Sequence, residues 1–221
     1  MLARDLISID IPPLKLYDEG KKAIEWMDEF KVSHLAITEK THYVGLVSDV
    51  EIMDLMTDQS QNFVSLRKNL SKPFIFEYQH AYEALKLFTR LKISLIPVLD
   101  AKEHYMGVIT QSNLLNYLSE LTDANETGSI IVLELHQQDY SLSQIAQIAE
   151  SNNAKILSLF LTPRRDSTEL DVTIKLNLRD ASAVLQTFER YGYIVKESYT
   201  QGNSTDNLKD RYESLMHYLN I

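Results

Sequence analysis

The first half of the chain contains one pattern twice, and this repeat limits the fold more than any other feature. Residues 31–37 (KVSHLAI) recur as residues 92–98 (KISLIPV), 61 positions later (92 − 31). Residues 43–48 (YVGLVS) recur as residues 105–110 (YMGVIT), 62 positions later (105 − 43). Repeats of this length are similar supersecondary units that bury their apolar faces on one another. We therefore predict two packed units with a ligand-sized cleft between them.

Composition narrows the range of partners. The chain has 221 residues, a net charge of −9 and no cysteine. A net negative charge argues against nucleic acids and anionic membranes, which both attract clustered basic side chains. No run of about 18 apolar residues is present, and charge interrupts residues 1–7 early, so we expect no membrane span, no signal peptide and a cytoplasmic location. The lack of cysteine excludes disulfides, thiolate metal sites and cysteine nucleophiles.

Each repeat is predicted to fold as helix, strand, strand, helix. In the first repeat, Asp18 is the expected N-cap of the leading helix. The apolar positions of that helix follow helical spacing: Ala23, Ile24, Met27 and Phe30. Strands are expected at residues 35–38 and 43–48. The short last helix carries three apolar side chains on one face: Val50, Met53 and Met56.

The second repeat follows the same order. Its leading helix is marked by Ala81, Ala84, Leu85, Phe88 and Leu91. Strands are expected at residues 95–99 and 105–109, with residues 62–72 connecting the two repeats. Its last helix is marked by Leu114, Leu115, Leu118 and Leu121.

The pattern changes after the turn-rich residues 121–128. Strands are expected at residues 130–135, 155–162 and 193–199, and the first of them is apolar except for Glu134. Another strand alternates apolar and polar side chains, its apolar positions being Leu170, Val172, Ile174 and Leu176. One helix begins at Ser141 and Gln144, which have capping-box spacing, and a second ends at Gly192. The order βαββαβ predicts a ferredoxin-like unit.

These elements predict an α+β protein of four parts. The repeats occupy residues 1–60 and 61–122, the ferredoxin-like unit residues 129–200, and a C-terminal helix residues 206–221. That helix is amphipathic through Leu208, Tyr212, Leu215 and Leu219. It either caps its own subunit or packs on a partner.

The second repeat resembles a CBS domain. Residues 96–100 (IPVLD) and 107–115 (GVITQSNLL) are similar to that family's pattern of a Pro-containing strand, a turn, and a Gly-hydrophobic-hydrophobic-Thr strand. Residues 35–37 and 45–52 resemble it less closely. The first 122 residues are thus identified as a tandem CBS pair, a Bateman-type module.

The second half resembles an ACT domain, on its topology and strand pattern. The order CBS-CBS-ACT at about this length is similar to the acetoin-utilisation accessory (AcuB-like) proteins. The loop at residues 136–141 has no glycine, unlike many ACT ligand loops, although Asp139 lies in the usual region. An ACT fold kept for dimerisation is the alternative.

The CBS resemblance implies that adenosyl ligands lie in clefts between the repeats. A Ser or Thr hydroxyl then contacts phosphate or ribose, and an Asp three residues later binds the ribose hydroxyls. The corresponding pairs here are Ser48 with Glu51 and Thr110 with Asn113, so neither has the Asp. Glu51 is one methylene longer, whereas Asn113 loses the charge but keeps an acceptor oxygen, which favours the second pair. The alternative is that both pairs only cap helices.

Two other residues are candidates for the nucleotide site. Pro97 belongs to the matched motif. His34 precedes a strand and could face a phosphate, although a packed or solvent-edge position is the alternative. His42 and His104 flank strand turns and are expected in solvent. The histidines show no metal-ligand spacing, and no catalytic motif is present, so we expect neither a metal site nor catalytic residues.

The resemblance implies a non-catalytic regulatory protein. Its CBS pair would sense AMP, ADP, ATP or S-adenosylmethionine, with no cofactor required. We expect a homodimer, because both module types leave apolar faces or sheet edges that a partner covers, and a client enzyme or transporter. Two alternatives remain: an interaction scaffold with degenerate ligand sites, and a regulatory subunit of an enzyme encoded elsewhere.

Overall fold

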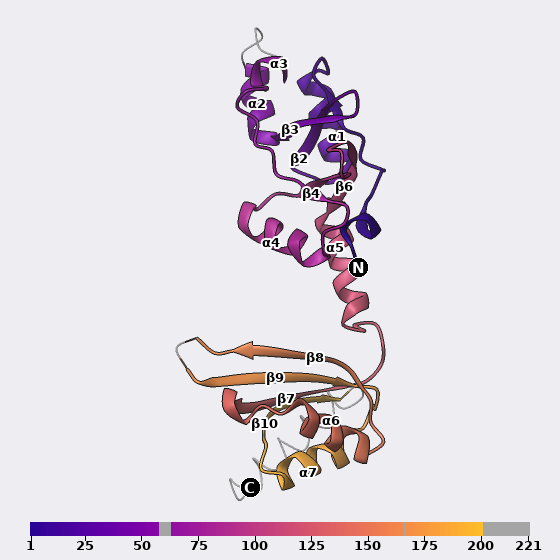
Figure 1. Cartoon of the computed structure of the whole chain (residues 1–221), viewed down its shortest axis with the longest axis vertical. Coiled ribbons are helices and arrows are strands. Elements are labelled where there is room, and N and C mark those ends of the chain that lie inside the picture. Colours follow the sequence, from indigo (N-terminus) through magenta and orange to yellow (C-terminus); the bar gives the residue numbers. More distant parts are fainter. Residues whose placement is uncertain (58–62, 166, 201–221) are drawn as a thin grey trace, which may run out of the picture. The chain divides into compact units, whose positions relative to one another are not determined.

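The computed structural model describes residues 1–57, 63–165 and 167–200. The chain divides into two compact units, Met1–Leu118 and the residues from Ser119 onward (Figure 1). Each unit has its own apolar core. Both units contain helices and strands, which confirms the α+β class. None of the helices in the described ranges is long and apolar enough to cross a lipid bilayer.

Each repeat of the first unit builds a three-stranded sheet flanked by helices. The first repeat comprises β1 (Leu14–Lys15), α1 (Gly20–Phe30), β2 (His34–Glu39), β3 (His42–Ser48) and α2 (Asp49–Thr57). The second comprises β4 (Ile75–Phe76), α4 (Ala81–Leu91), β5 (Leu95–Leu99), β6 (Tyr105–Thr110) and α5 (Gln111–Leu121). The sheet orders are β1-β2-β3 and β4-β5-β6, with the first pair parallel and the second antiparallel in each. Strands β1 and β4 were not predicted, because two residues are too short to show alternation.

The repeats share local geometry as well as order. Lys31 ends α1 and Lys92 ends α4, and both adopt the left-handed conformation, with φ of 54° and 55°. The backbone N–H of each bonds back into its helix, to Met27 and Phe88 respectively. This is a standard way of ending a helix, and its recurrence at equivalent positions confirms that the sequence repeat is a structural one.

The two repeats are interlocked through their leading segments. The 3₁₀ helix η1 (Ala3–Leu6) is joined to the second repeat, because the Ala3 N–H donates to the Gln79 carbonyl at 2.8 Å. Ser8 and Val108 exchange two backbone hydrogen bonds, of 2.8 and 3.1 Å. Conversely, the Leu46 N–H in the first repeat donates to the carbonyl of Ser71, which follows α3 (Phe63–Leu66). Each leading segment therefore lies against the other half.

The repeats also meet directly. Their buried apolar side chains form one continuous core, which confirms the predicted packing. The imidazole rings of His42 and His104 lie edge to face with centroids 5.6 Å apart, and His104 Nδ1 lies 3.0 Å from Asp100 Oδ2. His42 is exposed, as expected, whereas His104 is partly buried, because the two strand turns are brought together by the repeat packing.

Two helix predictions need correction. Val50, Met53 and Met56 share a face of α2, but that face is 49–63% exposed, and Ile52 and Leu55 are buried instead. The helix has apolar residues on two faces, so their spacing alone did not show which face packs against the core. Asp18 does not cap α1 either: the N-cap is Glu19, and the Asp18 carboxylate accepts from the Lys15 N–H and pairs with Lys22.

In the last helix of the second repeat, the buried side chains also differ in part from those predicted. Leu114 is buried in α5, and so is Tyr117, which was not among its predicted apolar positions. Leu115 is 67% exposed. In a helix with leucines on several sides, the contacts of the neighbouring sheet decide which are covered.

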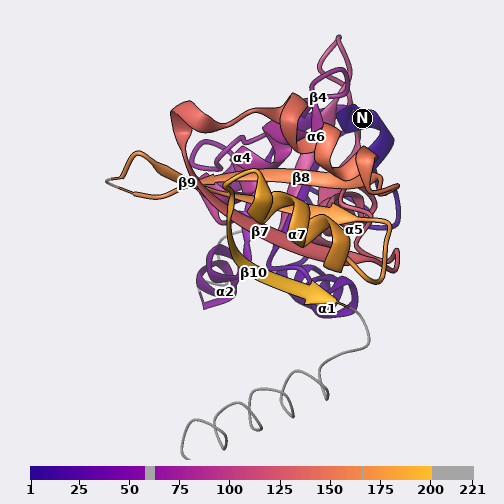
Figure 2. The same ribbon diagram turned by 90° about the horizontal axis from the view of Figure 1, so that it is seen from below.

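The second unit has the predicted βαββαβ order. Its elements are β7 (Ser129–His136), the 3₁₀ turn η2 (Gln137–Asp139), α6 (Leu142–Ser151), β8 (Ile156–Pro163), β9 (Glu169–Leu176), α7 (Ser182–Arg190) and β10 (Ile194–Thr200). The antiparallel sheet has the order β10-β7-β9-β8, and α6 and α7 lie on one of its faces (Figure 1, Figure 2). The even positions of β9 are buried, as the alternation predicted.

Two turn predictions in this unit are resolved by hydrogen bonds. Ser141 caps α6, because its Oγ accepts the Gln144 N–H at 3.3 Å. The Gln144 side chain does not complete the capping box, since it accepts from the Tyr193 hydroxyl instead. Gly192 follows α7 with φ of 80°, which confirms the glycine expected at that helix end. The predicted C-terminal helix at 206–221 lies outside the described residues.

Candidate functional site

The first unit contains two cavities whose walls come from both repeats. One, of about 490 Å³, has polar walls formed by His34, Ser48, Glu51, Ser71 and Lys72. Leu91 and Ile93 of the second repeat complete it. The other, of about 310 Å³, has polar walls that include Asp10, Lys31, Ser94, Thr110 and Asn113. We call them the Glu51 cavity and the Asn113 cavity.

The Ser48–Glu51 pair forms a complete capping box at the start of α2. Glu51 Oε2 accepts from the Ser48 N–H at 2.8 Å and from its hydroxyl at 2.7 Å, and Ser48 Oγ accepts the Glu51 N–H at 3.2 Å. The extra methylene of Glu51 thus lets its carboxylate fold back onto Ser48. Both side chains still line the cavity, so capping and ligand contact are compatible.

The Thr110–Asn113 pair repeats this geometry at the start of α5. Asn113 Oδ1 accepts from the Thr110 N–H at 3.1 Å and from its hydroxyl at 2.6 Å, while Thr110 Oγ1 accepts the Asn113 N–H at 3.0 Å. From the sequence, Asn113 was expected to offer its acceptor oxygen to a ligand. That oxygen already accepts two hydrogen bonds, so only the side-chain amide hydrogens remain for a ligand.

His34 lies at the start of β2, half-buried, and lines the Glu51 cavity. Its Nδ1 is 3.4 Å from the Ser94 backbone nitrogen, which can only donate, and 2.9 Å from Ser33 Oγ. Nδ1 is therefore the acceptor, and Nε2 carries the proton of the neutral ring. Burial holds the pKa of His34 below its usual value near 6.5, and the carboxylates of Asp49 and Glu51 oppose this only in part.

This lowered pKa predicts an acid-sensitive first unit. The unfolded chain takes up a proton at His34 as the pH falls through about 6.5, before the folded chain does, so the free energy of unfolding should fall there. Urea melts at pH 7.5 and 5.8, followed by the fluorescence of Trp26, the single tryptophan, measure the effect. His34→Leu copies the equivalent Leu95 and should flatten the pH dependence; an equal slope in both proteins contradicts this role.

The remaining sequence candidate does not reach either cavity. Pro97 is buried in β5 opposite Val108 and contributes no wall. Conversely, sequence reasoning missed Lys72 and Asp10, which line the two cavities from the leading segments. Both residues lie in the segments that lead into the repeats, and local sequence patterns give no indication that these segments cross to the opposite half.

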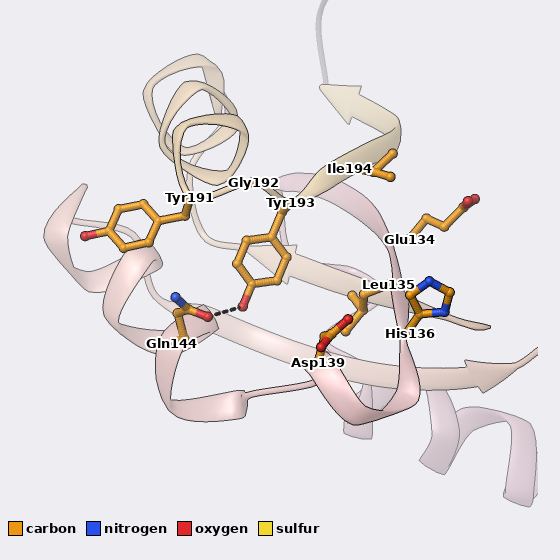
Figure 3. A pocket seen from close by; sticks show the side chains of 9 residues that line it. All are labelled: Glu134, Leu135, His136, Asp139, Gln144, Tyr191, Gly192, Tyr193 and Ile194. Atoms are coloured by element: carbon orange, nitrogen blue, oxygen red, sulfur yellow. Dashed lines mark hydrogen bonds between the residues drawn. The ribbon is translucent and has the colours of Figure 1, made fainter. Parts of the chain in front are cut away.

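A third cavity, of about 360 Å³, lies in the second unit (Figure 3). It is bounded by the loop after β7, with His136 and Asp139, and by the turn from α7 into β10. The Tyr193 hydroxyl donates to Gln144 Oε1 at 2.8 Å across it. Glu134 on its wall is already ion-paired with Arg164. The described lining residues include no lysine or arginine for the carboxylate of an amino acid.

Metal binding finds no support in the described residues. Within residues 1–57, 63–165 and 167–200, no group of three or more His, Asp or Glu side chains is placed to hold an ion. The polar groups that line the Glu51 cavity are an imidazole, hydroxyls, one carboxylate and one ammonium, and those that line the Asn113 cavity are hydroxyls, amides, one carboxylate and one ammonium. These are groups that bind a polar organic molecule through hydrogen bonds.

Comparison with known proteins supports the resemblance in the second repeat. Residues 68–120 match the family model for the CBS domain. The chain is also similar to a CBS domain pair/ACT domain protein from Thermotoga maritima, with 20% identity, a TM-score of 0.47, and coverage of 54% of this chain and 98% of that one.

Two further solved structures are similar over the same share of the chain. One is CBSX2 in complex with AMP, with 21% identity and a TM-score of 0.43, covering 54% of this chain and 97% of that one. The other is a CBS domain pair in complex with 5′-methylthioadenosine and S-adenosyl-L-methionine. It has 17% identity and a TM-score of 0.44, and again 54% of this chain and 97% of that one are covered.

Proposed function

We propose that this is a non-catalytic regulatory protein that senses an adenine nucleotide or related adenosyl compound between two CBS repeats. One observation carries the proposal. Two equivalent helix starts, each with a hydroxyl and a polar side chain three residues later, open onto cavities walled by the opposite repeat. A helix start offers N–H groups and a favourable dipole to an anion. The CBS match at residues 68–120 supports the ligand class.

Ligand binding would act through the contact between the repeats. Each cavity has walls from both halves, so a bound molecule touches both at once. A ligand shifts the relative position of the halves only if it binds one arrangement more tightly than the other. The interlocked leading segments, with Ser8 on β6 and Ser71 on β3, would transmit such a shift through backbone hydrogen bonds.

We further propose a homodimer that serves a client enzyme or transporter in the cytoplasm. The outward faces of α2 and α5 expose Val50, Met53 and Leu115, each at 58–67%. Apolar side chains gathered on helix faces favour coverage by a partner. The second unit, which resembles an ACT domain as in the AcuB-like proteins, would contribute further contacts. Light scattering at about tens of micromolar protein should give twice the mass of one chain. A mass equal to that of one chain would contradict the homodimer.

Isothermal titration calorimetry tests the ligand. We expect binding heat from at least one of AMP, ADP, ATP and S-adenosylmethionine. Circular dichroism must show folded protein in the same preparation. The absence of heat for all four would leave the second candidate, an interaction scaffold. That candidate is favoured by one observation: both hydroxyl pairs already satisfy each other as capping boxes.

A further inference from the structure

The two cavities of the first unit are related by the repeat but differ in chemistry. We infer that each chain binds one ligand, in the Glu51 cavity, and that this ligand is a nucleoside phosphate with a free ribose diol. The inference rests on the proposed function and narrows it in two ways. It selects one cavity of two, and it selects an anionic 5′ group over the cationic sulfonium of S-adenosylmethionine.

The diol preference follows from the acceptors that remain. In the Glu51 cavity, Oε2 is used by Ser48, and Oε1 has no hydrogen bond among the described residues. A carboxylate oxygen with open lone pairs accepts strong, charge-assisted bonds from hydroxyls. In the Asn113 cavity, Oδ1 is filled by Thr110, and the amide offers only N–H donors without a charge. The bond to a ribose hydroxyl is then a neutral one, about half as strong.

The phosphate preference follows from the cations. Lys72 lines the Glu51 cavity and has no acidic partner among the described residues. The neutral His34 ring adds an Nε2–H donor to the same lining. In the Asn113 cavity, the corresponding cation is Lys31, which Asp28 holds at 2.8 Å, and Asp10 adds a carboxylate to the wall. Lys72 thus shares its cavity with one carboxylate, that of Glu51, whereas Lys31 is paired with Asp28 and shares its cavity with Asp10, so the charges of the Glu51 cavity are the more favourable to an anion.

Cavity size does not decide between them. Volumes of about 490 and 310 Å³ both fall in the range of about 300–1,000 Å³ that ligand sites occupy. The cavities differ instead in the side chain three residues after the hydroxyl, Glu51 or Asn113, and in the carboxylates near the lining lysine.

Calorimetry with AMP gives the stoichiometry directly. The wild-type protein should bind one AMP per chain. Glu51→Gln keeps the capping box, since Gln also serves at that position, and should weaken binding on the order of tenfold or more. Asn113→Asp should leave the stoichiometry at one AMP per chain, because a further carboxylate in the cavity that already contains Asp10 and the paired Lys31 makes it still less favourable to a phosphate. Trp26 fluorescence melts check that both variants fold.

The ligand series separates the two halves of the inference. 2′-Deoxy-AMP should bind more weakly than AMP through loss of the bond to Glu51. Adenosine and S-adenosylmethionine should bind more weakly than AMP, and Lys72→Met should remove that difference. Two AMP per wild-type chain, or affinity unchanged in Glu51→Gln, overturns the inference and leaves the proposed function in place. No AMP binding by folded wild-type protein overturns both.

Discussion

Replacing Gly107 with alanine is expected to lower the free energy of unfolding of the first unit by about 3 kcal/mol. Gly107 lies in β6 with φ of 147°, a conformation that side chains rarely adopt. A Cβ there would lie 2.6 Å from Ile7 Cγ2 and 2.8 Å from the Ser8 carbonyl oxygen. Ser8 is the residue that pairs with Val108. The substitution therefore strains the backbone and also pushes the leading segment away from the second repeat.

Urea denaturation followed by Trp26 fluorescence measures this effect. Trp26 packs against the core of the first unit and is the only tryptophan, so its signal reports that unit. Met106→Ala is the matched control, because Met106 is the neighbouring residue and is 38% exposed. Its cost should stay below about 1 kcal/mol. Equal midpoints for Gly107→Ala and Met106→Ala would contradict the crossed packing of the leading segments.

Replacing Phe188 with alanine is expected to destabilise the second unit by about 4 kcal/mol. Phe188 in α7 is fully buried, and its ring lies edge to face with that of Tyr193 at 5.4 Å. Removing the ring leaves a cavity between helix and sheet that the neighbours fill only partly. Among the described residues, the core of this unit is formed by side chains between Ile131 and Val195 and by none from the repeats, so the loss should be confined to this unit.

Two signals separate the units in this experiment. Far-UV circular dichroism should show an early transition in Phe188→Ala, while the Trp26 transition stays at its wild-type position. Phe160→Ala makes the same chemical change at a site that is 44% exposed, and should cost about 1 kcal/mol. If the Trp26 transition in Phe188→Ala moved to the same lower urea concentration as the circular dichroism transition, the two units would unfold as one. That result would contradict two separate cores.

The repeat and the order of the second unit were predictable from local patterns. Repeated segments such as 43–48 and 105–110 carry strand and turn signals that act over a few residues, and the structure has equivalent strands there. The alternation around Leu170 to Leu176 likewise gave the buried face of β9. Such features depend on neighbours in the chain, which a sequence displays directly.

Features that depend on distant residues were not predictable. The inward face of α2 is selected by the sheet it meets, so Ile52 is buried and Met53 is not. The contact between His42 and His104 depends on how two turns, 62 residues apart (104 − 42), are brought together. The Asn113 side-chain oxygen is occupied because the Asn113 rotamer places it against the Thr110 hydroxyl. Each of these requires the packed structure.

The candidate site was predicted only in part, because its walls combine a local motif with residues from distant segments. The motif gave Ser48, Glu51, Thr110 and Asn113, and the structure places all four on cavity walls. It also suggested Pro97, which is a core residue of β5. Lys72 and Asp10 were missed because they come from leading segments that cross to the opposite half. Their charges nevertheless distinguish the two cavities.

A crystal structure of the protein grown with AMP tests the central claim most directly. We expect density for one AMP per chain in the Glu51 cavity, with the ribose hydroxyls on Glu51 Oε1 and the phosphate toward Lys72 and the start of α2. AMP bound at the second unit, or outside the space between the two repeats, would contradict it.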